Sequence, residues 1–249
     1  MKLILLRHGE SHWNLENRFT GWTDVELTNS GKKEAKEAGK KIYDEKIQIK
    51  TIYTSILKRA IQTTEIVSGC IKFPLNKVVC DWRLNERHYG ALQGLNKSET
   101  AEKFGEEQVK IWRRSFDISP PKLSPEDERH PKFNTAFSHL NKQLPTGESL
   151  RDVINRLNPF WTNYFNNVFK SGGNHLIVAH SNSLRAIIKI LDKLNAKEII
   201  DVNIPTGIPL IYQFDSSYNL LDKRFLIDNK TLKEKQSAII NQGSQKSDK

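Results

Sequence analysis

The 249-residue chain is long enough for one large domain or two small ones, and for a sizeable buried core. Only 37% of its residues are hydrophobic and its formal net charge is +10, which indicates an anionic partner, either a nucleic acid or a small acidic substrate. Two cysteines without a CxxC spacing argue against a disulfide framework or a zinc site, and no apolar run approaches the ~20 residues of a membrane span. We therefore expect a soluble cytoplasmic protein that binds neither a metal nor a membrane.

The first predicted element is a short apolar strand, Leu3 to Leu6, that ends abruptly in Arg7, His8 and Gly9. An apolar run bounded by glycine is typical of a buried strand in a parallel sheet, and open α/β sheets bind ligands at the carboxyl ends of their strands. Arg7 offers a planar fork of donors that matches a phosphate, and His8 is suited to act as a nucleophile near neutral pH. We expect Gly9 to let the backbone approach a ligand closely.

A helix over residues 32–43, a strand from Ile49 to Thr54 and a helix from Leu57 to Gly69 come next. Arg59 falls near the amino end of the second helix, just past the carboxyl end of the strand, where a helix N-terminus already favours anions. This position predicts a second phosphate clamp. The alternative is an ordinary surface arginine.

Glu86 lies between Arg83 and Arg87, after a short strand candidate at Val78-Val79. A carboxylate between two guanidiniums ionises readily and forms a salt bridge. Alternatively, Glu86 is an acid/base group beside a bound phosphate whose negative charge offsets the arginines. The residues alone leave both interpretations open.

Residues 97–116 have the pattern of one or two helices, and these end in Arg113 and Arg114. An adjacent arginine pair is commonly solvated. The proline-rich segment over residues 119–147 follows, and a loop of this length inside a compact domain is usually functional or mobile.

A long helix from Glu148 to Phe169, with an expected kink at Pro159, leads into a second apolar strand from His175 to Ala179. That strand ends in His180, and a helix from Leu184 to Leu191 follows. Two strands that each finish in a histidine, with arginines clustered nearby, are the strongest sign of a site that the residues give on their own.

Two closing strands are predicted over residues 208–214 and 220–226, and the polar segment 230–249 is expected to be a mobile tail. The alternation of strands and helices predicts an α/β fold.

Several longer motifs strengthen the prediction. They read RHGESHWN at 7–14, NRFTGW at 17–22, RLNERHYG at 83–90, GLNK at 94–97, WRR at 112–114 and NIPTG at 203–207. Together they resemble the histidine phosphatase superfamily and, within it, the cofactor-dependent phosphoglycerate mutases. The resemblance covers residues 2–227 and implies a three-layer α/β/α fold with a mostly parallel central sheet. It also implies a single catalytic domain over residues 1–229, with a lid insertion at about 95–147 and a tail that can cover the site.

The resemblance also assigns roles to residues. His8 would become a phosphohistidine, Glu86 would transfer the substrate's proton, and His180 would stabilise the transition state, with Arg7 and Arg59 as phosphate ligands. The implied substrate-binding residues are Ser11, Asn14, Thr20, Gly21, Arg87, Tyr89, Lys97, Arg113, Arg114, Ser181 and Asn182. Ser181 departs from the family pattern, which has glycine there, and its Cβ restricts the backbone.

The implied activity is the interconversion of 2- and 3-phosphoglycerate, primed by 2,3-bisphosphoglycerate and independent of metal. Bisphosphoglycerate synthase and phosphatase activities compete with it, depending on whether water reaches the phosphohistidine. Ser11, Thr20 and Gly21 match the mutase form. The expected partners are the phosphoglycerates and further copies of the chain, as a dimer or tetramer.

The rival hypothesis is a basic binding protein for nucleic acid, or a catalytically dead scaffold. It depends on the charge and the lysine-rich tail. The usual stacking-aromatic motifs and recognition helices of nucleic-acid-binding modules are not evident in the sequence, so no nucleic-acid partner is expected.

Overall fold

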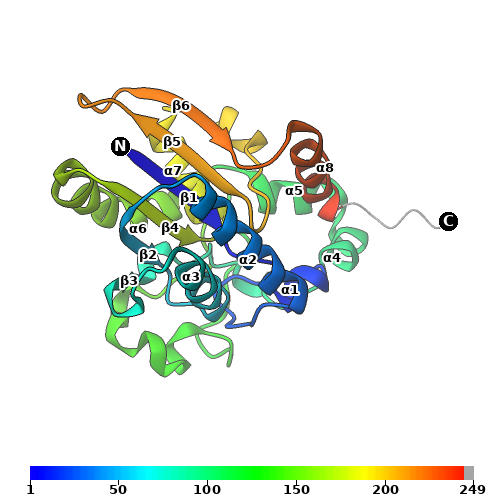
Figure 1. Ribbon diagram of the computed structural model, residues 1–249. Helices are drawn as coiled ribbons and strands as arrows, with labels where there is room; N and C mark the ends of the chain where they lie inside the picture. Colours follow the sequence, from blue (N-terminus) through cyan, green and yellow to red (C-terminus); the bar gives the residue numbers. More distant parts are fainter. Residues whose placement is uncertain (244–249) are drawn as a thin grey trace.

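The computed structural model describes residues 1–243 of the chain, and the last six residues of the expected tail lie outside the described part. A six-stranded sheet runs through the centre with helices on both faces (Figure 1). The predicted three-layer α/β/α fold is therefore confirmed.

The central sheet has the strand order β3-β2-β4-β1-β5-β6. The first four of these strands are parallel to one another, and β5 and β6 are antiparallel to their neighbours. In the part of the chain described, the strands are β1 (Lys2–Arg7), β2 (Ile49–Thr54), β3 (Val78–Cys80), β4 (Asn174–Ala179), β5 (Pro209–Phe214) and β6 (Leu220–Phe225).

Strand β1 shows why both faces of the sheet must be covered. Because successive side chains of a strand point to opposite faces, Leu3 and Leu5 belong to one apolar cluster, and Ile4 and Leu6 to another. The first cluster packs against α6 (Leu150–Asn163) and α7 (Ser181–Leu191), and the second against α2 (Asn29–Asp44) and α3 (Lys58–Ile71). A strand that is apolar on both faces thus fixes the three layers.

The helices around the sheet begin at capping residues. Thr28 caps α2, where its hydroxyl oxygen accepts a hydrogen bond from the amide of Gly31 at 2.9 Å. Ser149 and Asp152 form a capping box at the start of α6. These caps satisfy amide groups that the first turn of a helix leaves without a partner.

Four further helices lie beyond the carboxyl ends of the parallel strands. They are α1 (His12–Leu15), α4 (Lys97–Phe104), α5 (Glu106–Arg114) and α8 (Asn229–Ile240), and Figure 1 shows α8 beside α4 and α5. Short 3₁₀ turns cover Leu75–Lys77, Trp82–Leu84, Gly90–Leu92, Pro131–Phe133, Thr135–Gln143, Glu198–Asp201 and Asn241–Gly243.

The structure differs from the expected elements mainly at helix ends. Helix α2 begins at Asn29, three residues earlier than expected. Helix α6 contains Pro159, where the expected kink stays a prediction, and ends at Asn163, where a π turn (Tyr164–Val168) and a 3₁₀ turn (Phe169–Ser171) replace its expected last part. Helix α7 begins at Ser181, three residues earlier than expected. The expected tail contains α8, which is held by a hydrogen bond from Gln236 to the carbonyl of Asn203 at 3.1 Å.

Candidate active site

The two histidines at the strand ends lie side by side. Strands β1 and β4 pair in parallel with Arg7 opposite Ala179, so the next residue of each strand is His8 and His180. Their ring centroids are 4.9 Å apart, with the ring planes at 61°. The pairing of two neighbouring strands therefore brings together side chains that are 172 positions apart in sequence.

The ring of His8 is held with one nitrogen free. Its Nδ1 lies 2.7 Å from the carbonyl oxygen of Gly9. Because a carbonyl oxygen can only accept, Nδ1 carries the proton and Nε2 keeps its lone pair. Burial, followed by the charges of Arg59 and Arg7, lowers the pKa of His8 well below 6.5. His8 is thus a neutral imidazole with an available nucleophilic nitrogen.

His180 is oriented by a residue that the sequence did not single out. Its Nε2 lies 2.6 Å from the hydroxyl oxygen of Ser55, which follows β2. Burial, followed by the charge of Arg59, lowers the pKa of His180 well below its usual range. Strand β2 pairs with β4 in parallel, so the residues that follow the two strands lie close together. The strand order therefore carried the signal that Ser55 is a neighbour of His180.

Two buried guanidiniums flank the histidines. Arg7 donates from Nη1 to the carbonyl of Ile204 at 2.9 Å, and its Nε has no partner among the described residues. Arg59 donates to the carbonyls of Thr23 and Gly21 at 2.9 and 2.8 Å. Burial lowers the pKa of Arg59 to about 10, which still leaves it charged near neutral pH. The backbone carbonyls fix both cations in place before any ligand arrives.

Glu86 makes backbone contacts instead of a salt bridge with its sequence neighbours. Its Oε1 accepts hydrogen bonds from the amide of Arg87 at 2.7 Å and from the amide of Asn182 at 3.1 Å. Arg83 pairs with Asp81 at 2.6 Å. In the described part of the chain, the salt bridge that the sequence left open is therefore not formed, and Glu86 faces the cavity.

A cavity in front of the histidines gathers most of the predicted residues. Seven cationic side chains and one carboxylate, Glu86, line it among the residues that the structure describes. Predicted residues on its wall are Arg7, His8, Asn14, Thr20, Gly21, Arg59, Glu86, Tyr89, Lys97, Arg113, Arg114, Ser181 and Asn182. Burial lowers the pKa of Lys97 well below its usual range and that of Arg113 to about 10, and neighbouring cations add to both shifts. Such a cluster can hold a molecule with several negative charges.

Three predicted residues lie behind the wall. Ser11 is buried and caps α1, where its hydroxyl accepts from the amide of Asn14 at 3.3 Å. Arg87 donates to the carbonyl of Arg113 at 2.9 Å, with its guanidinium carbon 4.5 Å from the ring centre of Tyr89. His180 is fully buried behind His8. Ser11 and Arg87 therefore support residues of the wall, and neither lines the cavity among the described residues.

Sequence reasoning missed several residues of the wall. One of them is the buried Arg185, one turn after Ser181 on α7, which donates to Asn182 Oδ1 at 2.9 Å. Arg185 could have been predicted, because it lies one turn into the helix that follows His180, on the same side as Ser181. The other missed wall residues are Arg18, Phe19, Ile239 and Gln242.

Gly9 has a packing role that the sequence did not suggest. A Cβ on Gly9 would lie 2.2 Å from the carbonyl oxygen of Gly31, so the absent side chain makes room for the start of α2. The expected approach of its backbone to a ligand stays a prediction. Gly31 is restricted in the same way, because its own Cβ would lie 2.0 Å from the carbonyl oxygen of Glu10. The close contact of these two glycines sets the loop that follows His8 against α2.

The described residues also bear on metal binding and on membrane insertion. Within residues 1–243, no group of three His, Cys, Asp or Glu side chains could hold a metal ion. Over the same part of the chain, none of the helices is both long and apolar enough to cross a membrane.

The comparisons with known proteins agree with this geometry. The model of the histidine phosphatase superfamily (branch 1) matches residues 3–127 and 122–223, and the chain belongs to this superfamily. A curated relative from Treponema denticola, a 2,3-bisphosphoglycerate-dependent phosphoglycerate mutase, is 49% identical over 247 residues, which cover 99% of this chain and 100% of that protein.

Solved structures share the fold at lower identity. The mycobacterial glucosyl-3-phosphoglycerate phosphatase in complex with VO3 has a TM-score of 0.69 and 22% identity, with 92% of this chain and 98% of that chain covered. YhfR of Bacillus stearothermophilus has a TM-score of 0.64 and 25% identity, with 88% and 94% covered.

Proposed function

We propose that the chain interconverts 2- and 3-phosphoglycerate through a phosphohistidine on His8. The observation that carries this proposal is the free Nε2 of a neutral His8 at a cavity lined by seven cations and one carboxylate of the described residues. The 49% identity to a phosphoglycerate mutase over nearly the whole chain favours the mutase over a phosphatase. The solved glucosyl-3-phosphoglycerate phosphatase is 22% identical, so its likeness shows the fold and not its substrate.

In the transfer step, the substrate's free hydroxyl oxygen attacks the phosphorus on His8. An oxygen–phosphorus bond forms as the bond between Nε2 and phosphorus breaks, and Nε2 recovers its lone pair. Arg7 and Arg59, together with the neighbouring His180, stabilise the charge on the equatorial oxygens, the main contribution to catalysis of phosphoryl transfer.

Glu86 accepts the proton of the attacking hydroxyl and returns it to the oxygen that leaves in the reverse transfer. The doubly phosphorylated glycerate reorients between the two steps, and its other phosphate passes to His8. The net result is an isomerisation.

The cavity fits the priming cofactor, 2,3-bisphosphoglycerate. When bound, this molecule supplies the phosphoryl group that first loads His8. Its two phosphates and carboxylate match the excess of cations on the wall, and the unpartnered buried Nε of Arg7 is a donor that such an anion can satisfy. Lys97, Arg113 and Arg114 would hold the end of the molecule away from His8.

We infer that residues 95–147 act as a lid insertion of a single catalytic domain over residues 1–229, with α8 as a second cover. Lys97 donates to Gln242 at 3.3 Å, and Arg113 donates to the carbonyl of Ile239 at 3.2 Å. These contacts join the insertion to the segment after residue 229 across the mouth of the cavity. Exclusion of water by such a cover would favour transfer over hydrolysis.

Turnover of 3-phosphoglycerate with and without trace 2,3-bisphosphoglycerate tests the proposal. We expect isomerisation that needs the trace cofactor and outruns phosphate release. Hydrolysis faster than isomerisation would reject the mutase assignment in favour of a phosphatase.

A further inference from the structure

The loop that carries Glu86 has little regular structure of its own. It lies between the short edge strand β3 and helix α4, and its regular structure is limited to the 3₁₀ turns Trp82–Leu84 and Gly90–Leu92. Backbone carbonyls in such a segment lack the partners that a helix or sheet supplies, and buried ones must be satisfied elsewhere. The position of the Glu86 carboxylate therefore depends on what binds this backbone.

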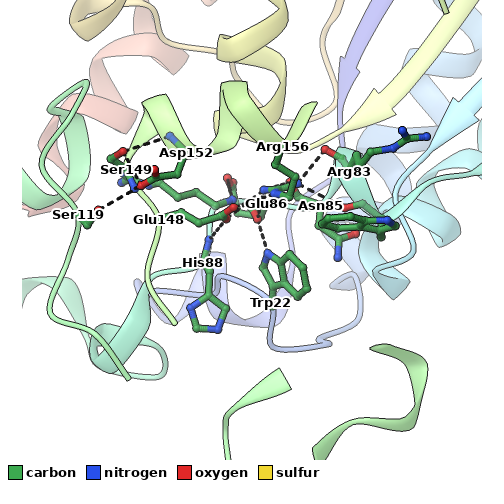
Figure 2. Close-up of polar contacts among 12 residues, drawn as sticks. Trp22, Arg83, Asn85, Glu86, His88, Ser119, Glu148, Ser149, Asp152 and Arg156 are labelled. Atoms are coloured by element: carbon green, nitrogen blue, oxygen red, sulfur yellow. Dashed lines mark hydrogen bonds and ion pairs between the residues drawn. The ribbon is translucent and has the colours of Figure 1, made fainter. Parts of the chain in front are cut away.

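One side chain from another element satisfies most of these carbonyls. Arg156, on α6, points from its helix toward the loop, as Figure 2 shows. Its Nη1 donates to Arg83 O at 2.8 Å and its Nη2 to Glu86 O at 3.2 Å, with longer contacts of 3.3 to 3.4 Å to the carbonyls of Trp82 and Asn85. Five donors in one plane make this possible, and a lysine could not reproduce it.

Glu148, two residues before the start of α6, binds the guanidinium of Arg156. Its carboxylate binds Arg156 through two hydrogen bonds, at 2.7 and 3.0 Å, and Oε2 also accepts from the amide of His88 at 2.8 Å. Both charged side chains are buried, at 7% and 5% exposure. From the other side, Trp22 Nε1 donates to the same Glu86 carbonyl at 2.6 Å (Figure 2).

We propose that the Arg156–Glu148 ion pair and Trp22 form a positioning unit that holds Glu86 in place for proton transfer. The inference depends on the function proposed above, in which Glu86 carries the proton. Within the described residues, neither member of the ion pair lines the cavity, so the pair acts through the loop and not on the substrate. A pair that only stabilised the fold would not need to bind the Glu86 carbonyl.

The main test is Arg156→Lys, which keeps the buried charge but loses the fork. We expect kcat for isomerisation to fall about 10- to 100-fold with little change in KM, because a misplacement of about 1 Å at a reacting group costs rates of that order. Arg151→Lys is the matched control on the same helix, since Arg151 is exposed and pairs only weakly with Asp117 at 3.3 Å. Its kcat should equal that of the unmodified chain.

A double-mutant cycle separates positioning from general stability. In the Glu86→Gln background, measured as single-turnover transfer from the phosphorylated enzyme, Arg156→Lys should cause no further loss. An equal loss in both backgrounds, or an unchanged kcat in the single variant, would overturn the inference.

Trp22→Phe supplies a second variant in case Arg156→Lys fails to fold. It removes one donor to the Glu86 carbonyl and keeps an aromatic ring, so we expect a several-fold loss of kcat that also disappears in the Glu86→Gln background. Additive losses would contradict the inference. The proposed function fails separately, if the unmodified chain shows no isomerisation.

Discussion

The chemistry at the residue scale depends on the proton of one imidazole. The Gly9 carbonyl fixes the tautomer of His8, and burial beside two arginines keeps the ring neutral. The place of His8 at the site could be predicted from the sequence, because Arg7 and His8 follow an apolar strand directly, and its role as the nucleophile stays a prediction. The tautomer could not, since it depends on a backbone carbonyl whose direction only the folded loop sets.

The hydrogen bond between Ser55 and His180 provides a test at this scale. Ser55→Ala removes the only side-chain partner that the described structure gives His180 Nε2. The loss of one buried hydrogen bond, about 1 kcal/mol, corresponds to a five- to tenfold fall in kcat if it is felt in the transition state. Steady-state kinetics measure it, with the exposed Ser217→Ala as control. A wild-type kcat in Ser55→Ala would show that Ser55 does not orient the ring.

At the scale of elements, the apolar strands and amphipathic helices could be predicted because burial repeats with the period of each element. Helix α8 could not, because it is polar and is held by contacts such as Lys235–Glu34 at 3.7 Å. Its cap was a missed signal, since Asp228 accepts a hydrogen bond from the amide of Thr231 at 2.9 Å. Helix α7 starts early because small polar residues such as Ser181 and Ser183 suit a first turn better than an interior.

The surroundings of two helical glycines predict opposite effects on stability when each is replaced by alanine. Gly31 lies where the loop after β1 contacts α2, and Gly69 lies in open space. Gly31→Ala places a Cβ against a backbone oxygen, so we expect the free energy of unfolding to fall by about 1–3 kcal/mol despite the better helix propensity of alanine. At Gly69, on α3, an added Cβ meets no other atom within 4 Å, so Gly69→Ala should raise the free energy of unfolding by about 0.4–1 kcal/mol. Denaturant unfolding measures both. A Gly31→Ala protein as stable as Gly69→Ala would contradict the close packing.

For the whole molecule, the positions of the positive charges indicate which kind of anion the protein binds. Arg59 and Arg185 are each only 1% exposed, and they share one cavity with other cations. Buried guanidiniums can reach a small anion but not the backbone of a nucleic acid, so the site favours the phosphoglycerate hypothesis over the rival one. The assembly of the chain into a dimer or tetramer, and its location in the cytoplasm, stay predictions.

Buried histidines predict how the stability of the molecule depends on pH. Burial lowers the pKa of His88 to about 3 and that of His175 to about 4, from an ordinary 6.5. As the pH falls below 6.5, the unfolded chain binds these protons first, so the free energy of unfolding decreases by about 1.4 kcal/mol per pH unit for each histidine. The loss from His175 stops near pH 4, where the folded state also binds the proton.

Chemical unfolding at pH values between 7 and 4 measures this slope. His175→Phe keeps a planar ring beside Tyr164 and Phe169. It should reduce the slope of the free energy of unfolding against pH by about 1.4 kcal/mol per pH unit, the contribution of one histidine. His12→Gln, at an exposed position on α1, is the control and should leave the slope as it is. An unchanged slope in His175→Phe would show that folding does not lower the pKa of this ring.

The central claim is that His8 bonds to phosphorus, and mass spectrometry of the protein after incubation with 2,3-bisphosphoglycerate tests it most directly. The account predicts one added phosphate per chain, lost in acid and mapped to His8, with none on a folded His8→Ala variant. A phosphate on another residue, or normal isomerisation by His8→Ala, would contradict it.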